Sequence, residues 1–284
     1  MRSVFSRIFP SSLIPAVILL GGAVLLGGAT IASADERIIV SGSTTVLPIM
    51  QKAVEAFMHK HPNVRIEVSG GGSGNGIKAL TDKNCNIAMS SRGIKDKEVE
   101  AAKAAGVTPL EHVAALDAVL PIVNPKNPVS DLSVEQLRGI FAGTITNWKD
   151  VGGQDGKIVV VSRDTSSGTY ETWQEYILGK DVRVFAGALL QASSGAVIQT
   201  ISGNPRAIGY DGIGYVNKSV KALKVNGIAG SAETALGKTY PVSRELYLYT
   251  DGEPTGATAQ FITFFKSAEG QALVKEVGFI PLQK

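Results

Sequence analysis

The sequence has one cysteine, three histidines and a charged fraction of only 19% over 284 residues. The single thiol, Cys85, excludes an internal disulfide and a multi-thiolate metal site. Three histidines leave little material for a metal centre, so neither a metal nor another cofactor is expected. The 28 basic and 25 acidic residues nearly cancel, which excludes the basic surface that nucleic-acid-binding proteins present.

The first 34 residues have the pattern of a secretory signal peptide. Arg2 and Arg7 precede an apolar run over residues 13–31, and Ala32-Ser33-Ala34 supplies the small residues of a cleavage site. The alternative is an uncleaved membrane anchor, because the apolar run is almost long enough to span a bilayer. Cysteine is absent from the cleavage point, so no lipoprotein anchor is expected. We therefore predict cleavage near Ala34-Asp35 and a soluble, periplasmic protein.

In the rest of the chain, short β-rich apolar runs alternate with helical patterns. This alternation predicts an α/β fold with mainly parallel strands. Strands are predicted at residues 37–40, 64–68, 86–89, 119–123, 157–162 and 207–210. Helices are predicted at residues 46–60, 77–81, 95–105, 134–141, 170–178, 257–265 and 268–277.

Three of the predicted strands lead into loops of serine, threonine and glycine at or near the start of a helix. The loops are Ser43-Thr44-Thr45, residues 72–76 and residues 166–169. A helix N-terminus has unpaired N–H groups and a partial positive charge, so it attracts an anion. Arg92 and Arg163 also follow strand ends, and a guanidinium holds an oxyanion through paired N–H groups. One such loop is ordinarily a helix cap, but three of them beside two arginines predict a site for a small oxyanion.

The glycine-rich loop, residues 70–76, matches none of the common nucleotide or nucleophile motifs. It lacks the Gly-Lys-Ser/Thr of a P-loop and the glycine spacing and long helix of a dinucleotide fingerprint. Asn75 stands where a nucleophile elbow centred on Ser73 would need its final glycine.

Four segments in this order resemble the phosphate-binding proteins of bacterial high-affinity phosphate ABC transporters, the PstS-like family. They are Gly42-Ser43-Thr44-Thr45-Val46, residues 70–76, Met89-Ser90-Ser91-Arg92, and Arg163 with Ser167-Gly168-Thr169. The resemblance runs from about Ile38 to the C-terminus. It implies a type II periplasmic-binding-protein fold of two lobes, each a mainly parallel sheet flanked by helices, joined by two hinge strands. We expect residues 35–117 and 212–284 to form lobe 1 and residues 118–211 to form lobe 2.

The resemblance also implies a function without enzymatic chemistry. Inorganic phosphate would bind between the lobes of a monomer and pass to the membrane permease subunits of an ABC transporter, with no nucleic acid involved. The expected phosphate contacts are Ser43, Thr44, Thr45, Ser73, Gly74, Ser91, Arg92, Asp117, Arg163, Ser167, Gly168 and Thr169.

The sequence departs from the family pattern at one position. Family members place an aspartate shortly after the third strand, where it accepts the proton of hydrogen phosphate, whereas this chain has Ser91-Arg92. An acceptor oxygen disfavours sulfate, which has no proton to donate. We expect Asp117 to replace it, with Asp164 as the second candidate.

Three other functions remain open from the sequence. The chain could bind another oxyanion, such as sulfate or molybdate, or it could act as a phosphate-sensing module. An exported phosphatase is the third, but such catalysis needs metal ligands or an activated nucleophile, which the histidines and Cys85 do not supply.

Overall fold

The structure, a computed structural model, describes residues 36–282, so the predicted signal peptide lies outside the described residues. The strands are β1 (Glu36–Gly42), β2 (Val64–Gly70), β3 (Ile87–Ser90), β4 (Pro109–Val123), β5 (Asp131–Leu132), β6 (Val159–Arg163), β7 (Leu189–Gln191), β8 (Ala207–Gly212), β9 (Lys221–Ala222), β10 (Lys224–Val225) and β11 (Ser243–Asp251). The α-helices are α1 (Leu47–Lys60), α2 (Ser73–Thr81), α3 (Asp96–Ala104), α4 (Val134–Ala142), α5 (Gly168–Trp173), α6 (Ser194–Gly203), α7 (Ala232–Leu236), α8 (Gly256–Lys266) and α9 (Ala268–Glu276). Two 3-10 helices, η1 (Trp148–Val151) and η3 (Ile213–Tyr215), and a π-helix, η2 (Gln174–Leu178), complete the description.

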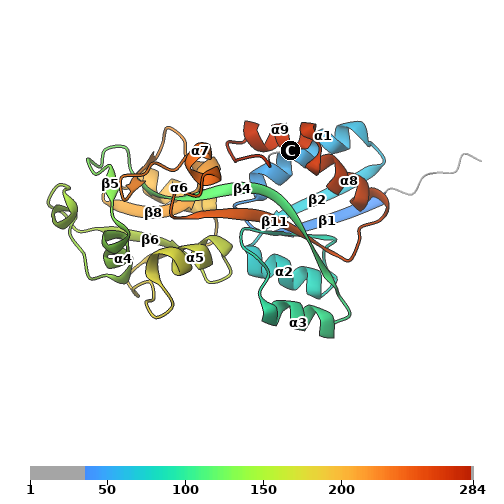
Figure 1. The fold of residues 1–284 in the computed structure, drawn as a ribbon, viewed down its shortest axis with the longest axis horizontal. Helices are drawn as coiled ribbons and strands as arrows, with labels where there is room; N and C mark the ends of the chain where they lie inside the picture. Colours follow the sequence, from blue (N-terminus) through green and yellow to red (C-terminus); the bar gives the residue numbers. More distant parts are fainter. Residues whose placement is uncertain (1–35, 283–284) are drawn as a thin grey trace, which may run out of the picture. The chain divides into compact units, whose positions relative to one another are not determined.

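The long strands are connected in the order β2-β1-β3-β11-β4-β8-β6-β7. At one end β2, β1 and β3 are parallel, and at the other end β8, β6 and β7 are parallel. Between them β11 pairs antiparallel with both β3 and β4, and β4 pairs antiparallel with β8. Figure 1 shows β4 and β11 running side by side from one group of elements to the other.

The first core lies around β1, β2 and β3. Phe57 of α1 packs edge-on against Phe261 of α8, with ring centroids 5.2 Å apart, and β1 contributes the buried Ile38 and Val40. In Figure 1, α1, α8 and α9 cover one face of these strands, and α2 and α3 lie on the opposite side. Each buried aromatic or aliphatic side chain of this kind contributes about 1.5–3 kcal/mol by leaving water.

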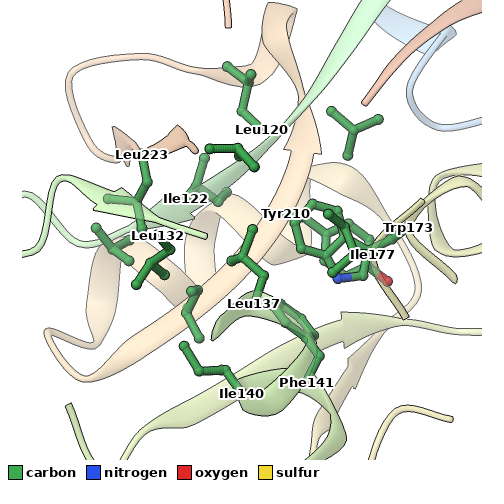
Figure 2. Packing of buried hydrophobic residues seen from close by; sticks show 14 of the residues in the cluster. Leu120, Ile122, Leu132, Leu137, Ile140, Phe141, Trp173, Ile177, Tyr210 and Leu223 are labelled. Carbon is green, nitrogen blue, oxygen red and sulfur yellow. The ribbon is translucent and has the colours of Figure 1, made fainter. Parts of the chain in front are cut away.

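The second core lies around β6 and β8. The indole of Trp173 stacks on the ring of Tyr210 at a centroid distance of 4.5 Å, and Phe141 meets Trp173 edge-on at 5.1 Å. Figure 2 shows these three rings together, with the aliphatic side chains of Ile122 and Leu137 beside them.

These two cores define the two lobes and the strands that connect them. The buried apolar residues of the second core run from Ala118 to Val242, with Ile280 in addition, and include Val220 and Tyr240. We therefore propose that the second lobe continues to about residue 242, beyond the boundary predicted after residue 211. With this boundary, the chain crosses between the lobes twice, along strand β4 and along strand β11.

Most predicted strands and helices match the structure within a few residues. Strand β4 is longer, because it begins at Pro109 instead of residue 119, and β11 lies where no strand is predicted. Two further differences have local causes. Helix α2 starts at Ser73 instead of residue 77 because Gly72, at φ 97°, makes the turn that leads into it. Helix α6 was not predicted, because its serine, threonine and β-branched residues are modest helix formers. It is started by Ser193, whose hydroxyl accepts a hydrogen bond from the N–H of Ala196.

Candidate functional site

The three predicted serine- and glycine-rich loops meet in the structure. The hydroxyl of Thr45, at the start of α1, lies 2.8 Å from that of Thr169 on α5. The hydroxyls of Ser73 and Ser91 are 3.2 Å apart. A Cβ atom on Gly168 would lie 2.5 Å and 2.6 Å from those two hydroxyl oxygens. These residues are buried, so hydroxyl groups from both lobes face one another at a closed seam.

Arg163 lies at the same seam and is almost entirely buried, with 2% of the residue exposed. It donates hydrogen bonds to the hydroxyl oxygens of Thr44 at 3.0 Å and Ser194 at 3.2 Å, and also to the carbonyl oxygens of Gln191 and Ala192. Among residues 36–282, no carboxylate forms a salt bridge with it. A buried cation whose direct partners are all neutral favours the binding of an anion beside it.

Ser43 and Ser167 hold the starts of two helices. The hydroxyl of Ser43 accepts hydrogen bonds from the N–H groups of Thr45 and Val46. The hydroxyl of Ser167 accepts one from the N–H of Tyr170 at 3.2 Å. Both residues are buried, and their roles as phosphate contacts stay predictions.

Gly74 and Arg92 make contacts of other kinds. The N–H of Gly74 donates to the carbonyl oxygen of Ser166 at 3.0 Å, which joins the two lobes by a backbone hydrogen bond. The guanidinium of Arg92 faces carboxylates, with Glu98 at 2.7 Å and Glu171 at 2.9 Å. The structure thus places Arg92 in an ion-pair cluster beside Ser91, and its direct contact with phosphate stays a prediction.

Asp117 is fully buried, and both of its oxygens already accept hydrogen bonds. Oδ2 accepts from Nε and Nη2 of Arg244 at 2.9 Å and 2.7 Å, and Oδ1 accepts from the N–H of Ile213 at 3.0 Å. Arg244 in turn donates to the hydroxyl of Thr169 at 3.0 Å. The pair therefore links β4 and β11, the two connecting strands, to the start of α5.

Asp164, the second predicted acceptor, orders the loop before α5. Its Oδ1 accepts hydrogen bonds from the N–H of Ser166 at 2.8 Å and from the hydroxyl of the same residue at 2.5 Å.

Ser194, Asp211 and Arg244 belong to the same cluster but were not among the predicted site residues. Asp211 is fully buried on β8, and its Oδ1 accepts from the hydroxyl of Ser194 at 2.9 Å and from the N–H of Gly212 at 2.8 Å. Within the described chain, its Oδ2 has no hydrogen-bond partner. Burial raises the pKa of Asp211 to about 6, although Arg163 opposes the shift.

Two of these three residues carry a signal in the sequence. Ser194 lies in Ser193-Ser194-Gly195, a fourth loop of the type that marked the other three. Asp211 is an acidic residue at the end of the apolar run 207–210, and charged side chains are rare at such buried positions unless they have a specific role. For Arg244, only the pairing of β11 with β4 shows its proximity to Asp117.

The residues from 36 to 282 contain neither a candidate metal site nor a candidate membrane span. This part of the chain holds no group of three histidine, cysteine, aspartate or glutamate side chains placed to bind a metal ion. None of its helices has the length and apolar character needed to cross a bilayer.

Comparison with known proteins assigns the family. The family model of the PBP superfamily domain matches residues 27–269. The phosphate-binding protein PstS of Bacillus subtilis is 35% identical over 251 residues, which cover 88% of this chain and 82% of the relative. The chain belongs to the PstS family of phosphate-binding proteins. PstS of Borreliella burgdorferi is 33% identical over 261 residues, covering 88% of this chain and 91% of that protein.

Solved structures of proteins named for phosphate transport agree with this assignment. A protein from Clostridium perfringens, named as a phosphate ABC transporter substrate-binding protein and crystallised with bound phosphate, superposes with a TM-score of 0.81 at 38% identity. The match covers 87% of this chain and 100% of that one. An ABC-type phosphate transport receptor from Vibrio cholerae has a TM-score of 0.71 at 35% identity, with 86% and 100% covered. The two-lobe periplasmic-binding-protein fold predicted from the sequence is confirmed.

Proposed function

We propose that this protein binds inorganic phosphate between its two lobes and delivers it to an ABC transporter permease for uptake. The observation that carries the proposal is Arg163, a buried cation with only neutral partners, surrounded by hydroxyl groups from both lobes. PstS relatives are named for phosphate binding, and the C. perfringens structure holds phosphate. The protein acts as a carrier without enzymatic chemistry, as a monomer outside the cytoplasm after loss of its signal peptide.

The site suits a small oxyanion because it concentrates donors without bulk charge. The starts of α1 and α2 in one lobe and of α5 and α6 in the other lie at the seam, and N–H groups at such starts attract anions. Arg163 supplies a buried formal positive charge. The proposed phosphate contacts are Thr44, Thr45, Ser73, Ser91, Arg163, Ser167, Gly168 and Thr169.

We assign the acceptor for the proton of hydrogen phosphate to Asp211 in place of Asp117. Each Asp117 oxygen is held by a donor of the protein, whereas Oδ2 of Asp211 has none in the described chain. A buried acceptor without a donor costs about 1–3 kcal/mol. A protonated phosphate oxygen would satisfy it, and fully deprotonated sulfate would repel it.

Isothermal titration of protein freed of carried phosphate by unfolding and refolding tests the proposal. We expect one-to-one binding of phosphate with the wild type and loss of binding with Arg163→Met, while sulfate competes poorly. Asp211→Asn should let sulfate compete, because an amide N–H replaces the repelling oxygen. A flat titration of the folded wild type would refute phosphate binding, and tighter binding of sulfate or molybdate would establish the alternative oxyanion. Hydrolysis of a phosphate ester would favour the phosphatase.

A further inference from the structure

Beside the proposed phosphate site, four charged side chains form one cluster. Arg92 donates to both carboxylate oxygens of Glu98, at 2.7 Å and 2.8 Å. Its Nε lies 2.9 Å from Oε2 of Glu171, and Nζ of Lys95 contacts the same oxygen. The Arg92 side chain is 9% exposed, Glu98 19% and Glu171 20%, so much of the cluster is shielded from water. We call these four residues the rim cluster.

The rim cluster joins the two lobes. Arg92, Lys95 and Glu98 belong to the first lobe, in the loop after β3 and the first turn of α3, whereas Glu171 belongs to α5 of the second lobe. Helices α2 and α5 lie on the same side of the β4–β11 pair (Figure 1). Glu171 is therefore the member whose ion pairs must break when the lobes separate.

The position of the cluster connects it to phosphate binding. Arg92 directly follows Ser91, and Glu171 lies two residues after Thr169. Ser91 and Thr169 are proposed phosphate contacts on opposite lobes. The ion pairs from Glu171 therefore span the same seam as the proposed contacts and hold the start of α5 against the loop after β3.

The contacts within the first lobe prepare Arg92 for this role. Glu98 accepts from both Arg92 terminal nitrogens and also from the N–H of Lys95 at 2.9 Å. These contacts lie within one lobe, so they persist when the lobes part. Arg92 is thereby kept in place, and the closed state alone gains the pairing with Glu171.

We propose that Glu171 is a positioning residue that latches the two lobes together through Arg92 and Lys95, and that this latch sets the rate at which bound phosphate leaves. The inference rests on the proposed function for its ligand. It gives Arg92 a role as the latch partner instead of a direct phosphate contact. A latch that forms only after closure slows dissociation and leaves the encounter with phosphate unchanged.

The test compares Glu171→Gln with Glu175→Gln, a matched control on the adjoining π-helix. Glu175 is exposed and makes no salt bridge within the described residues. Association and dissociation of radiolabelled phosphate are measured at about 0.01 M and 1 M salt, where the Debye length is about 30 Å and 3 Å. We expect Glu171→Gln to raise the dissociation rate about threefold to fivefold, the upper part of the range for ion pairs that are partly open to solvent. Its association rate should stay within about twofold of the wild type.

Lys95→Met and the double variant complete a thermodynamic cycle. We expect the effects of the two substitutions on the dissociation rate to be non-additive, and this coupling between Lys95 and Glu171 should weaken at high salt. Equal dissociation rates for Glu171→Gln, Glu175→Gln and wild type would overturn the latch. A loss of affinity that arises only from slower association would overturn it as well.

A second measurement separates the latch from the identity of the ligand. Spin labels on cysteines introduced at Glu100 and Lys180, one exposed site on each lobe, report the distance between the lobes. Glu171→Gln should shift the distance distribution toward larger separations, and Glu175→Gln should not. If the wild type bound no phosphate but this shift occurred, the proposed function would fail and the latch would stand. An unchanged distribution would refute the latch directly.

Discussion

The unpartnered carboxylate oxygen of Asp211 makes a specific prediction about stability and pH. Burial raises the pKa of Asp211 from 3.8 to about 6, so the folded chain binds this proton more tightly than the unfolded chain. The protonated form therefore favours folding below about pH 4, and that contribution is lost as the pH rises through about 6. The difference between the two pKa values corresponds to about 3 kcal/mol of folding free energy.

Asp211→Asn removes the free-energy cost of burying a charged carboxylate above about pH 6, because an amide is neutral at every pH in this range. The Asn oxygen can still accept from Ser194 and Gly212, while its buried N–H group lacks a protein acceptor at a cost of about 1 kcal/mol. In ligand-free protein, we expect a net gain of about 2 kcal/mol at about pH 7.5, or roughly 4–8 °C in the unfolding midpoint. Near pH 4 the aspartate is itself protonated, so the gain should vanish or reverse.

Thermal unfolding followed by circular dichroism in phosphate-free buffers measures the unfolding midpoints of wild type and variant near pH 7.5 and near pH 4. Asp181→Asn, on an exposed residue, controls for the change in net charge. A lower midpoint for Asp211→Asn near pH 7.5, or the same difference from wild type at both pH values, would refute the reasoning.

Two further predictions concern the seam and the connecting strands. Gly168→Ala places a methyl group 2.5–2.6 Å from the hydroxyls of Ser73 and Ser91. Phosphate affinity measured by titration should fall at least about tenfold, while the secondary structure measured by circular dichroism is retained. Unchanged affinity would show that the lobes need not approach this closely. Asp117→Asn leaves Arg244 buried without its counter-charge and should cost about 3–5 kcal/mol in urea unfolding; a loss below about 1 kcal/mol would mean that water or another group compensates the arginine.

The fold could be predicted from the sequence where local patterns determine the element. Helix α4 is an example, because Ser133 and Gln136 form a capping box that is visible in the residues themselves. Strand β11 is different, because what identifies its role is the antiparallel pairing with β3 and β4. That pairing joins residues more than a hundred positions apart, which no local pattern encodes.

In the candidate site, too, some residues can be recognised from the local sequence and others cannot. The loops containing Thr45, Ser73 and Gly168 can be recognised in the sequence, because a helix start needs small and hydroxyl-bearing residues at the site itself. The partners of a charged side chain are set by tertiary packing, so the sequence could not show that Arg92 faces Glu98 and Glu171. For the same reason the sequence favours Asp117 as the acceptor, whereas the structure pairs it with Arg244.

The pairing of β4 with β11 has a consequence for how members of this family can diverge. Ala118, where the chain leaves the first core, lies directly opposite Ser243, where it returns. The whole intervening stretch thus begins and ends at one pair of neighbouring residues, like a domain inserted into a loop of its host. Exchange of that stretch between two members requires only two junctions, both at the same place in the structure. Recombination at these junctions would exchange the second lobe in one step, and the contacts that would have to be conserved are those of Ile213 and Tyr215, which pack against the first core.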